Sequence, residues 1–148
     1  MTGRVLALDL GSKRIGVAVS DPGRVLASPL TTVARGRRPA DDHRRIVELV
    51  DEVEAVRVVV GLPLSLDGSR GRAAHLVEDE VVRLEAELTV PVELFDERFT
   101  TVSASRSLRD RGVKARDQRA VVDREAATVL LQAWLDGGPR DDVRAPGG

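Results

Sequence analysis

The sequence predicts an α/β fold in which a mixed five-stranded sheet is flanked by helices. Three consecutive strand patterns open the chain, which is typical of an antiparallel meander. Two short apolar runs, 57–61 and 91–95, then alternate with helical patterns, as parallel βα units do. The 148 residues suffice for one core. We therefore expect a single domain over 1–136 and a disordered tail rich in Gly, Pro, Asp and Arg over 137–148.

The opening strands are predicted over 5–10 and 15–20, where aliphatic residues dominate. The segment 21–24, Asp-Pro-Gly-Arg, has Pro and Gly where a type II turn requires them. It leads into a third strand over about 25–33. Pro29 within this strand indicates a sheet edge or a bulge, because proline cannot donate to the hydrogen-bond ladder.

The helices are predicted from apolar residues that recur at helical spacing. After a basic loop over 35–39, Asp41 or Asp42 begins a helix that runs to about residue 54. Another helix follows the loop 62–71 and runs to about residue 88. Two more are predicted over 101–111 and 120–136, with Gly137 as the cap. The apolar side carries Ile46, Leu49, Val50 and Val53 in the first helix, and Leu76, Val77, Val81 and Leu84 in the second.

Composition excludes several classes of protein. The chain has no Cys and only two His, which excludes disulfides and thiolate metal sites and disfavours a zinc centre. No apolar run approaches the ~20 residues that a membrane helix needs. Asp9, Lys13 and Arg14 interrupt the N-terminal apolar stretch, so no signal peptide is predicted. We expect a soluble cytoplasmic protein that does not contact the membrane.

One carboxylate lies inside the aliphatic strand predicted over 5–10. Side chains alternate across a strand, so Asp9 shares a face with Val5 and Ala7. A buried, unpaired carboxylate costs on the order of several kcal/mol. Packing gives no reason for an acid here, which favours a metal ion or a bound cationic group over the alternative, a carboxylate that caps the following turn.

Two further acids are expected at the same place. Glu97 directly follows the strand over 91–95, and ligand sites in open α/β sheets form beyond the carboxyl ends of strands. Asp123 shares a helix face with apolar positions, namely Ala126, Ala127, Leu130, Leu131 and Trp134. Alone, Glu97 could begin a helix and Asp123 could complement a helix dipole. Three acids from three elements on interior faces favour a divalent-cation site. Hard cations such as Mg²⁺ and Mn²⁺ prefer carboxylate oxygens, and two such ions can promote phosphodiester cleavage.

Four stretches, 8–21, 59–69, 95–101 and 123–132, resemble the signature blocks of the YqgF (RuvX) family. It is a family of pre-16S rRNA nucleases, also described as Holliday junction resolvase homologues. The resemblance implies an RNase H-like fold, with Asp9, Glu97 and Asp123 matching the family's acidic triad. Asp9 and Asp123 would then ligate Mg²⁺ or Mn²⁺, two ions in all, and Glu97 would ligate one or orient the attacking water.

Charge distribution favours a polyanionic partner. The segment 98–119 carries seven bases and two acids and directly follows Glu97, although a solvated helix face is the alternative explanation. A second basic cluster lies between 35 and 45. Candidate substrate-binding residues are Lys13, Arg14, Arg98, Thr100, Arg106, Arg109 and Arg116. With few aromatic residues, we expect recognition of backbone and shape.

The expected function is metal-dependent endonucleolytic cleavage in 5′-end processing of pre-16S rRNA, with ribosomal precursor particles as possible partners. A Holliday junction resolvase and a non-catalytic nucleic-acid-binding module are the alternatives. The stretch 8–21 also resembles the phosphate loop of sugar kinases, actins and chaperone ATPases. Those proteins need two such domains, so phosphotransfer is a distant alternative. No heptad or exposed apolar helix face indicates a dimer, which favours a monomer, whereas symmetric junction cleavage calls for a two-fold dimer.

Overall fold

A computed structural model describes residues 3–100 and 116–137, with the backbone alone over 116–124. Its centre is a five-stranded sheet with the strand order β3-β2-β1-β4-β5. β1 pairs antiparallel with β2 and parallel with β4, so the sheet is mixed, as the sequence predicts. The strands are β1 (Val5–Leu10), β2 (Arg14–Ser20), β3 (Ala27–Ala34), β4 (Arg57–Leu62) and β5 (Val92–Asp96).

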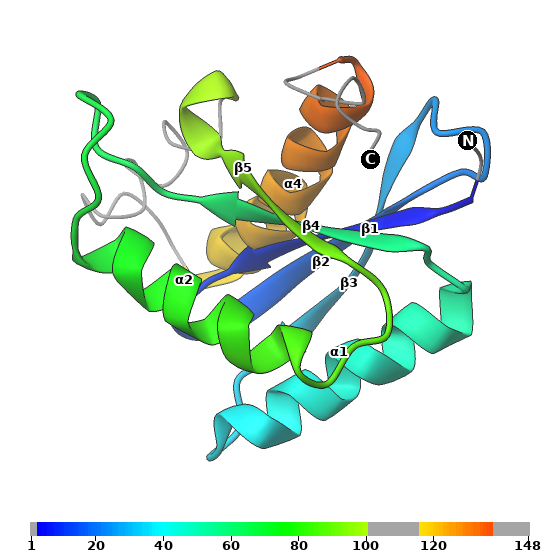
Figure 1. The fold of residues 1–148 in the computed structure, drawn as a ribbon, viewed down its shortest axis with the longest axis horizontal. Coiled ribbons are helices and arrows are strands. Elements are labelled where there is room, and N and C mark those ends of the chain that lie inside the picture. Colours follow the sequence, from blue (N-terminus) through cyan, green and yellow to red (C-terminus); the bar gives the residue numbers. More distant parts are fainter. Residues whose placement is uncertain (1–2, 101–115, 138–148) are drawn as a thin grey trace.

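Among the described residues, three helices cover the two faces of this sheet (Figure 1). α1 (Pro39–Val53) and α2 (Arg72–Glu85) pack on one face, and α4 (Arg116–Leu135) packs on the other. The core is accordingly divided in two. On the α1 and α2 side, aliphatic residues such as Leu6, Leu8 and Ile46 are completely buried. On the α4 side, small residues let the helix approach the sheet closely, among them Ala7, Ala18, Ala126 and Ala127.

The prediction for Pro29 is confirmed. β3 is an edge strand, and its register with β2 shifts between Val17 and Ala18, where Ala18 pairs with Pro29.

The turn before β3 differs from the prediction. Gly23 has no positive φ, which a type II turn would require there, whereas Arg24 has φ 62°. The Asp21 carboxylate stabilises this turn by accepting backbone N–H bonds of 2.7 to 3.0 Å from Gly23, Val25 and Leu26.

α1 begins at Pro39, before the predicted aspartates, and its N-cap residue Arg38 makes no side-chain cap bond. Asp42 cannot serve as the cap, because its carboxylate accepts the Gly36 N–H at 2.7 Å and binds the Arg35 guanidinium. The buried stripe of α1 is otherwise as predicted, and Val53 is partly buried against it.

α2 ends at Glu85, and the prediction that Leu76 lies on its buried side is wrong. Leu76 is 56% exposed, and Ala74 instead joins Val77, Val81 and Leu84 in the core. Residue 76 is two positions after Ala74 and one before Val77, which places it off the stripe that faces the sheet.

α4 begins at Arg116, four residues before the predicted start, and Gly137 follows it with φ 103°, as expected for a C-terminal glycine. The helix predicted over 101–111 and the tail over 138–148 lie outside the described residues. In the ranges that the structure describes, no helix is long and apolar enough to cross a membrane.

Candidate active site

Asp9 lies in the last third of the central strand, where β1 pairs Asp9 with Gly16 of β2. Its side chain is 1% exposed. Val5 and Ala7, four and two positions before it, pack against α4, so the strand alternation directs Asp9 to the α4 face of the sheet. The sequence prediction that this carboxylate is interior is confirmed.

Glu97 approaches the same face from β5. It is the first residue of a short 3₁₀ helix, η1 (Glu97–Phe99), and is 2% exposed. A Cβ atom added to Gly61 of β4 would lie 2.7 Å from Glu97 Oε2 and 3.1 Å from its Cγ. The absence of a side chain at Gly61 therefore makes the space that the Glu97 carboxylate occupies.

The strand register brings Asp9 and Glu97 to neighbouring positions. Leu8 of β1 pairs with Val60 of β4, so the next residues along the two parallel strands are Asp9 and Gly61. Since the Glu97 carboxylate lies over Gly61, the two acids gather on one face at the carboxyl ends of adjacent strands. Ligand sites of open α/β sheets form at such positions.

Hydrogen bonds fix the backbone around Glu97. The Asp96 carboxylate caps η1 by accepting the Arg98 N–H at 2.9 Å, and the Thr100 N–H and hydroxyl donate to the Glu97 carbonyl at 3.1 and 3.0 Å. Arg98 Nη2 donates to Asp96 Oδ2 at 2.6 Å. The side-chain hydrogen bond from Arg98 is the main reason that the pKa of Asp96 lies below its usual value. Arg98 and Thr100, expected to contact substrate, thus stabilise the Glu97 turn.

The Asp123 side chain lies outside the described part of the structure, but its place along α4 is described. The end of α4 lies at the start of β3 and β5, because Gln132 Oε1 accepts the Ala27 N–H at 2.8 Å and Trp134 Nε1 donates to Glu93 at 3.0 Å. The earlier turns of α4 therefore extend toward the carboxyl end of β1 (Figure 1). Asp123 precedes the buried Ala126 and Ala127 by one turn.

The described side chains contain no group of three His, Cys, Asp or Glu close enough to hold a metal ion. This search includes Asp9 and Glu97 but not the Asp123 side chain. The structure thus brings together two of the three predicted acids, and it leaves the position of the third carboxylate as a prediction.

Only some of the predicted basic residues lie in the described part of the structure. Lys13 is exposed in the β1–β2 turn, and Arg14 begins β2. Arg106 and Arg109 lie outside the described residues, and of Arg116 only its place as the first residue of α4 is described. The second basic cluster, over 35–45, is largely neutralised: Arg35, Arg38, Arg44 and Arg45 each form an ion pair with a carboxylate.

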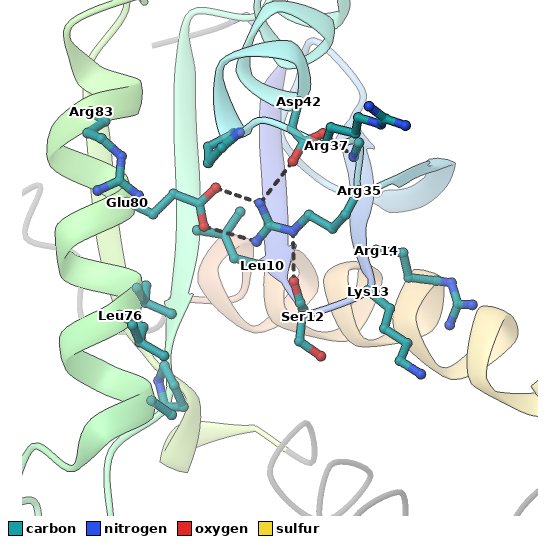
Figure 2. A pocket seen from close by; sticks show the side chains of 16 residues that line it. Leu10, Ser12, Lys13, Arg14, Arg35, Arg37, Asp42, Leu76, Glu80 and Arg83 are labelled. Carbon is teal, nitrogen blue, oxygen red and sulfur yellow. Dashed lines mark hydrogen bonds and ion pairs between the residues drawn. The ribbon is translucent and has the colours of Figure 1, made fainter.

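The sequence analysis missed a buried polar network on the opposite face of the sheet (Figure 2). Arg35 donates two hydrogen bonds to Glu80 of α2, at 2.7 and 2.9 Å, and His43 Nε2 lies 2.7 Å from Glu80 Oε2. A signal was present: Glu80 lies three residues after Val77 and four before Leu84, on the buried stripe of its helix. An acid on such a stripe requires a partner.

Solved structures of similar fold support the architecture. A Thermus thermophilus RuvC in complex with a Holliday junction substrate matches with a TM-score of 0.57 and 18% identity, over 90% of this chain and 93% of that one. A second Thermus thermophilus RuvC structure matches with a TM-score of 0.52 and 16% identity, over 89% of this chain and 93% of that one. These similarities confirm the α/β RNase H-like fold.

The chain belongs to the RuvX (YqgF) family, whose sequence profile, described as "Holliday junction resolvase", matches residues 3–137. A Rhodococcus erythropolis protein is 51% identical over 138 residues, covering 90% of this chain and 78% of that protein. An Anaeromyxobacter dehalogenans protein is 53% identical over 133 residues, covering 90% of this chain and 96% of that protein. Both carry the name "Putative pre-16S rRNA nuclease". The family resemblance expected from the four sequence stretches is confirmed.

Proposed function

We propose that this protein is a metal-dependent endonuclease that hydrolyses phosphodiester bonds, and that its reaction site is the acidic pair Asp9 and Glu97 completed by Asp123. The observation that carries the proposal is that the Glu97 carboxylate lies over Gly61, on the same face of the sheet as Asp9 and on the strand next to it. Both carboxylates are almost fully buried, and a cation between or beside them would stabilise the charge of two buried acids on one face. Membership of a family of nuclease-named proteins supports the same reading.

The donor set fits a hard divalent cation. Carboxylate oxygens are the ligands that Mg²⁺ and Mn²⁺ prefer, and the described residues at this site include no thiolate. Asp9 and Asp123 would hold the metal ions, and Glu97 would ligate one ion or orient the attacking water. When bound, the ions would activate water and stabilise the leaving oxygen. The bonds that Thr100 donates to the Glu97 carbonyl fix the backbone of the turn that carries this side chain.

The substrate we favour is the precursor of 16S rRNA, cleaved at its 5′ end. The protein would bind this RNA within ribosomal precursor particles. The names of the relatives support RNA, and one active site suffices for this cleavage. The description of the family profile favours the second candidate, a Holliday junction resolvase, which would need two sites in a dimer. Backbone phosphates would contact the basic segment 98–119, including Arg106, Arg109 and Arg116.

The substrate test offers the purified protein a precursor rRNA end and a four-way DNA junction in parallel with Mn²⁺, while its mass in solution is measured. Cleavage of the RNA by a monomer is expected. Paired symmetric cuts in the junction by a stable dimer, with the RNA intact, would establish the second candidate instead.

The role of the acids is tested with Asp9→Asn, which keeps the shape of the side chain and removes its charge. We expect loss of cleavage, weaker Mn²⁺ binding in a calorimetric titration, and an unchanged circular dichroism spectrum. Full cleavage by the folded variant would contradict the proposed site. If the wild-type protein binds nucleic acid but neither binds Mn²⁺ nor cleaves, the protein is a non-catalytic binding module.

A further inference from the structure

A cavity of about 710 Å³ lies on the face of the sheet opposite Asp9. Its walls are the β1–β2 turn, the segment before α1, and α2 (Figure 2). The volume is in the range of pockets that take small ligands, roughly 300–1,000 Å³. The cavity adjoins the acidic site along the chain, because Leu10 and Gly11, the two residues that follow Asp9, both line it.

The floor of the cavity is held by Arg35, whose hydrogen bonds join three elements. Its Nε donates to the Gly11 carbonyl at 3.0 Å, and its Nη atoms donate to Glu80 of α2 and, at 3.4 Å, to Asp42 of α1. Burial alone would raise the pKa of Glu80, but the hydrogen bonds from Arg35 and His43 outweigh it and hold this pKa below its usual value. Glu80 is therefore ionised, and Arg35 binds both it and Asp42 from within the protein.

The rim of the cavity is positively charged. Besides Arg35, three basic residues with exposed side chains line it: Lys13, Arg37 and Arg83. Within the described chain, Lys13, Arg37 and Arg83 form no ion pair, whereas arginines elsewhere on the surface do, such as Arg57 with Glu93 and Arg70 with Glu78. Without Arg14, whose side chain faces the α4 side of the sheet, four bases against two acids leave the lining with a formal charge of +2. Unpaired cations around a concave surface favour an anionic ligand.

The turn that carries Lys13 lies between this cavity and the acidic site. Gly11 is constrained there, since an added Cβ would lie 2.6 Å from the Arg14 carbonyl. Arg14 faces the α4 side with Gly16 and Ala18, because β2 alternates and Ile15 and Val17 belong to the other core. Lys13, exposed on this tight turn, would let a phosphate backbone cross the end of the sheet. Leu76, exposed at 56%, offers an apolar wall inside the cavity.

We propose that the cavity between the β1–β2 turn and α2 binds backbone phosphates of a nucleic-acid strand, outside the phosphodiester that reacts at Asp9. This inference rests on the proposed function and adds a second contact region to it. Arg37 and Arg83 hold phosphates, Lys13 bridges the two regions, and Arg35 positions the turn without contacting the ligand. The cavity thereby sets how much of the strand beyond the scissile bond is needed for tight binding.

The experiment measures binding of fluorescent single-stranded RNA by anisotropy in metal-free buffer, where no cleavage occurs. Two lengths are compared, about 4 and about 20 nucleotides. Arg37→Ala and Arg83→Ala each remove an exposed charge, so the fold should be unaffected. Arg4→Ala is the matched control, because Arg4 is exposed, has no ion pair among the described residues and does not line the cavity.

Each cavity variant should weaken binding of the long RNA about threefold to fivefold and lower its salt slope by about 1. The control should change neither quantity, and the short RNA should lose less affinity than the long one. Equal effects of Arg4→Ala and Arg37→Ala, or unchanged affinity in both cavity variants, would overturn the inference. A separate arm titrates orthophosphate. If orthophosphate binding depends on Arg37 and Arg83 but RNA binding does not, the ligand is a free phosphate and the proposal is also wrong.

Failure of this inference is distinguishable from failure of the proposed function. Cleavage by the wild-type protein with Mn²⁺ is scored separately from anisotropy. A protein that cleaves RNA, with affinity independent of the cavity, retains the proposed function and loses only the second contact region. A protein that binds RNA through the cavity but does not cleave loses the proposed function alone.

Discussion

Replacing Gly61 with Ala tests the arrangement of the acidic site most directly. The added Cβ would lie 2.7 Å from Glu97 Oε2, whereas ordinary contacts begin near 3.4 Å. The carboxylate must therefore move by roughly 0.7 Å, the difference between these two distances. Gly61 has no positive φ, so Ala is compatible with the backbone of β4. The end of the flexible Glu97 side chain, and not the strand, should give way.

A shift of this size at a reacting group is costly for catalysis. Misplacement by about 1 Å can reduce a rate about 100-fold, so we expect Gly61→Ala to lower kcat about 10-fold to 100-fold. Folding should be little affected, because Ala loses less conformational freedom than Gly, by roughly 0.5–1 kcal/mol, and this offsets part of the crowding. The effect should therefore appear in kcat while the protein remains folded.

The assay compares single-turnover cleavage with Mn²⁺ and thermal unfolding for wild type, Gly61→Ala and Gly71→Ala. Gly71 is the matched control, since a Cβ there would meet only Ser65 Oγ at 3.8 Å, an ordinary contact. Wild-type kcat in folded Gly61→Ala would refute the reasoning that Glu97 must occupy the space over Gly61. An equal loss in the control would show that the effect is not specific to this site.

Three further predictions concern the metal, the basic segment and the buried network. Chelation should not unfold the protein, because both described cores are largely aliphatic; cooperative unfolding in a chelator at constant temperature would contradict this. In the segment 98–119, combined Arg106→Ala, Arg109→Ala and Arg116→Ala should weaken binding to unrelated nucleic-acid sequences equally and flatten the salt dependence of binding. Filter binding at several salt concentrations would measure both effects. Glu80→Gln should cost about 3 kcal/mol of stability at neutral pH. Because the folded-state pKa of Glu80 lies below its ordinary value of 4.5, its contribution is complete above pH 4.5 and is lost as the pH falls below that value. The free energies of urea unfolding of the wild-type protein and of Glu80→Gln should therefore converge in acid. A constant difference between them across this pH range would count against the ion pair.

Local patterns in the chain were enough to predict the strands and the two acids of the site. The aliphatic side chains of β1 can be buried on both faces only in the middle of a sheet. An acid within this run indicates a functional site because burial of a charge is costly. Glu97 was identified because the end of a strand can be recognised from its apolar run. Pro29 marked an edge strand because its missing N–H excludes a central position. Each of these inferences depends on residues close together in the chain.

Contacts between distant segments were not predictable in this way. In the sequence, Arg35 is one cation of a loop and Glu80 is one acid of a helix 45 residues away. Only the fold brings the two together as an ion pair. Arg35 also binds Asp42, so this carboxylate does not cap α1, which begins at Pro39, earlier than expected. Gly61 carries no signal of its own, since its importance comes from the space that Glu97 fills across the strand. Periodicity reports which face of an element is buried, but only packing in three dimensions determines which side chains meet there.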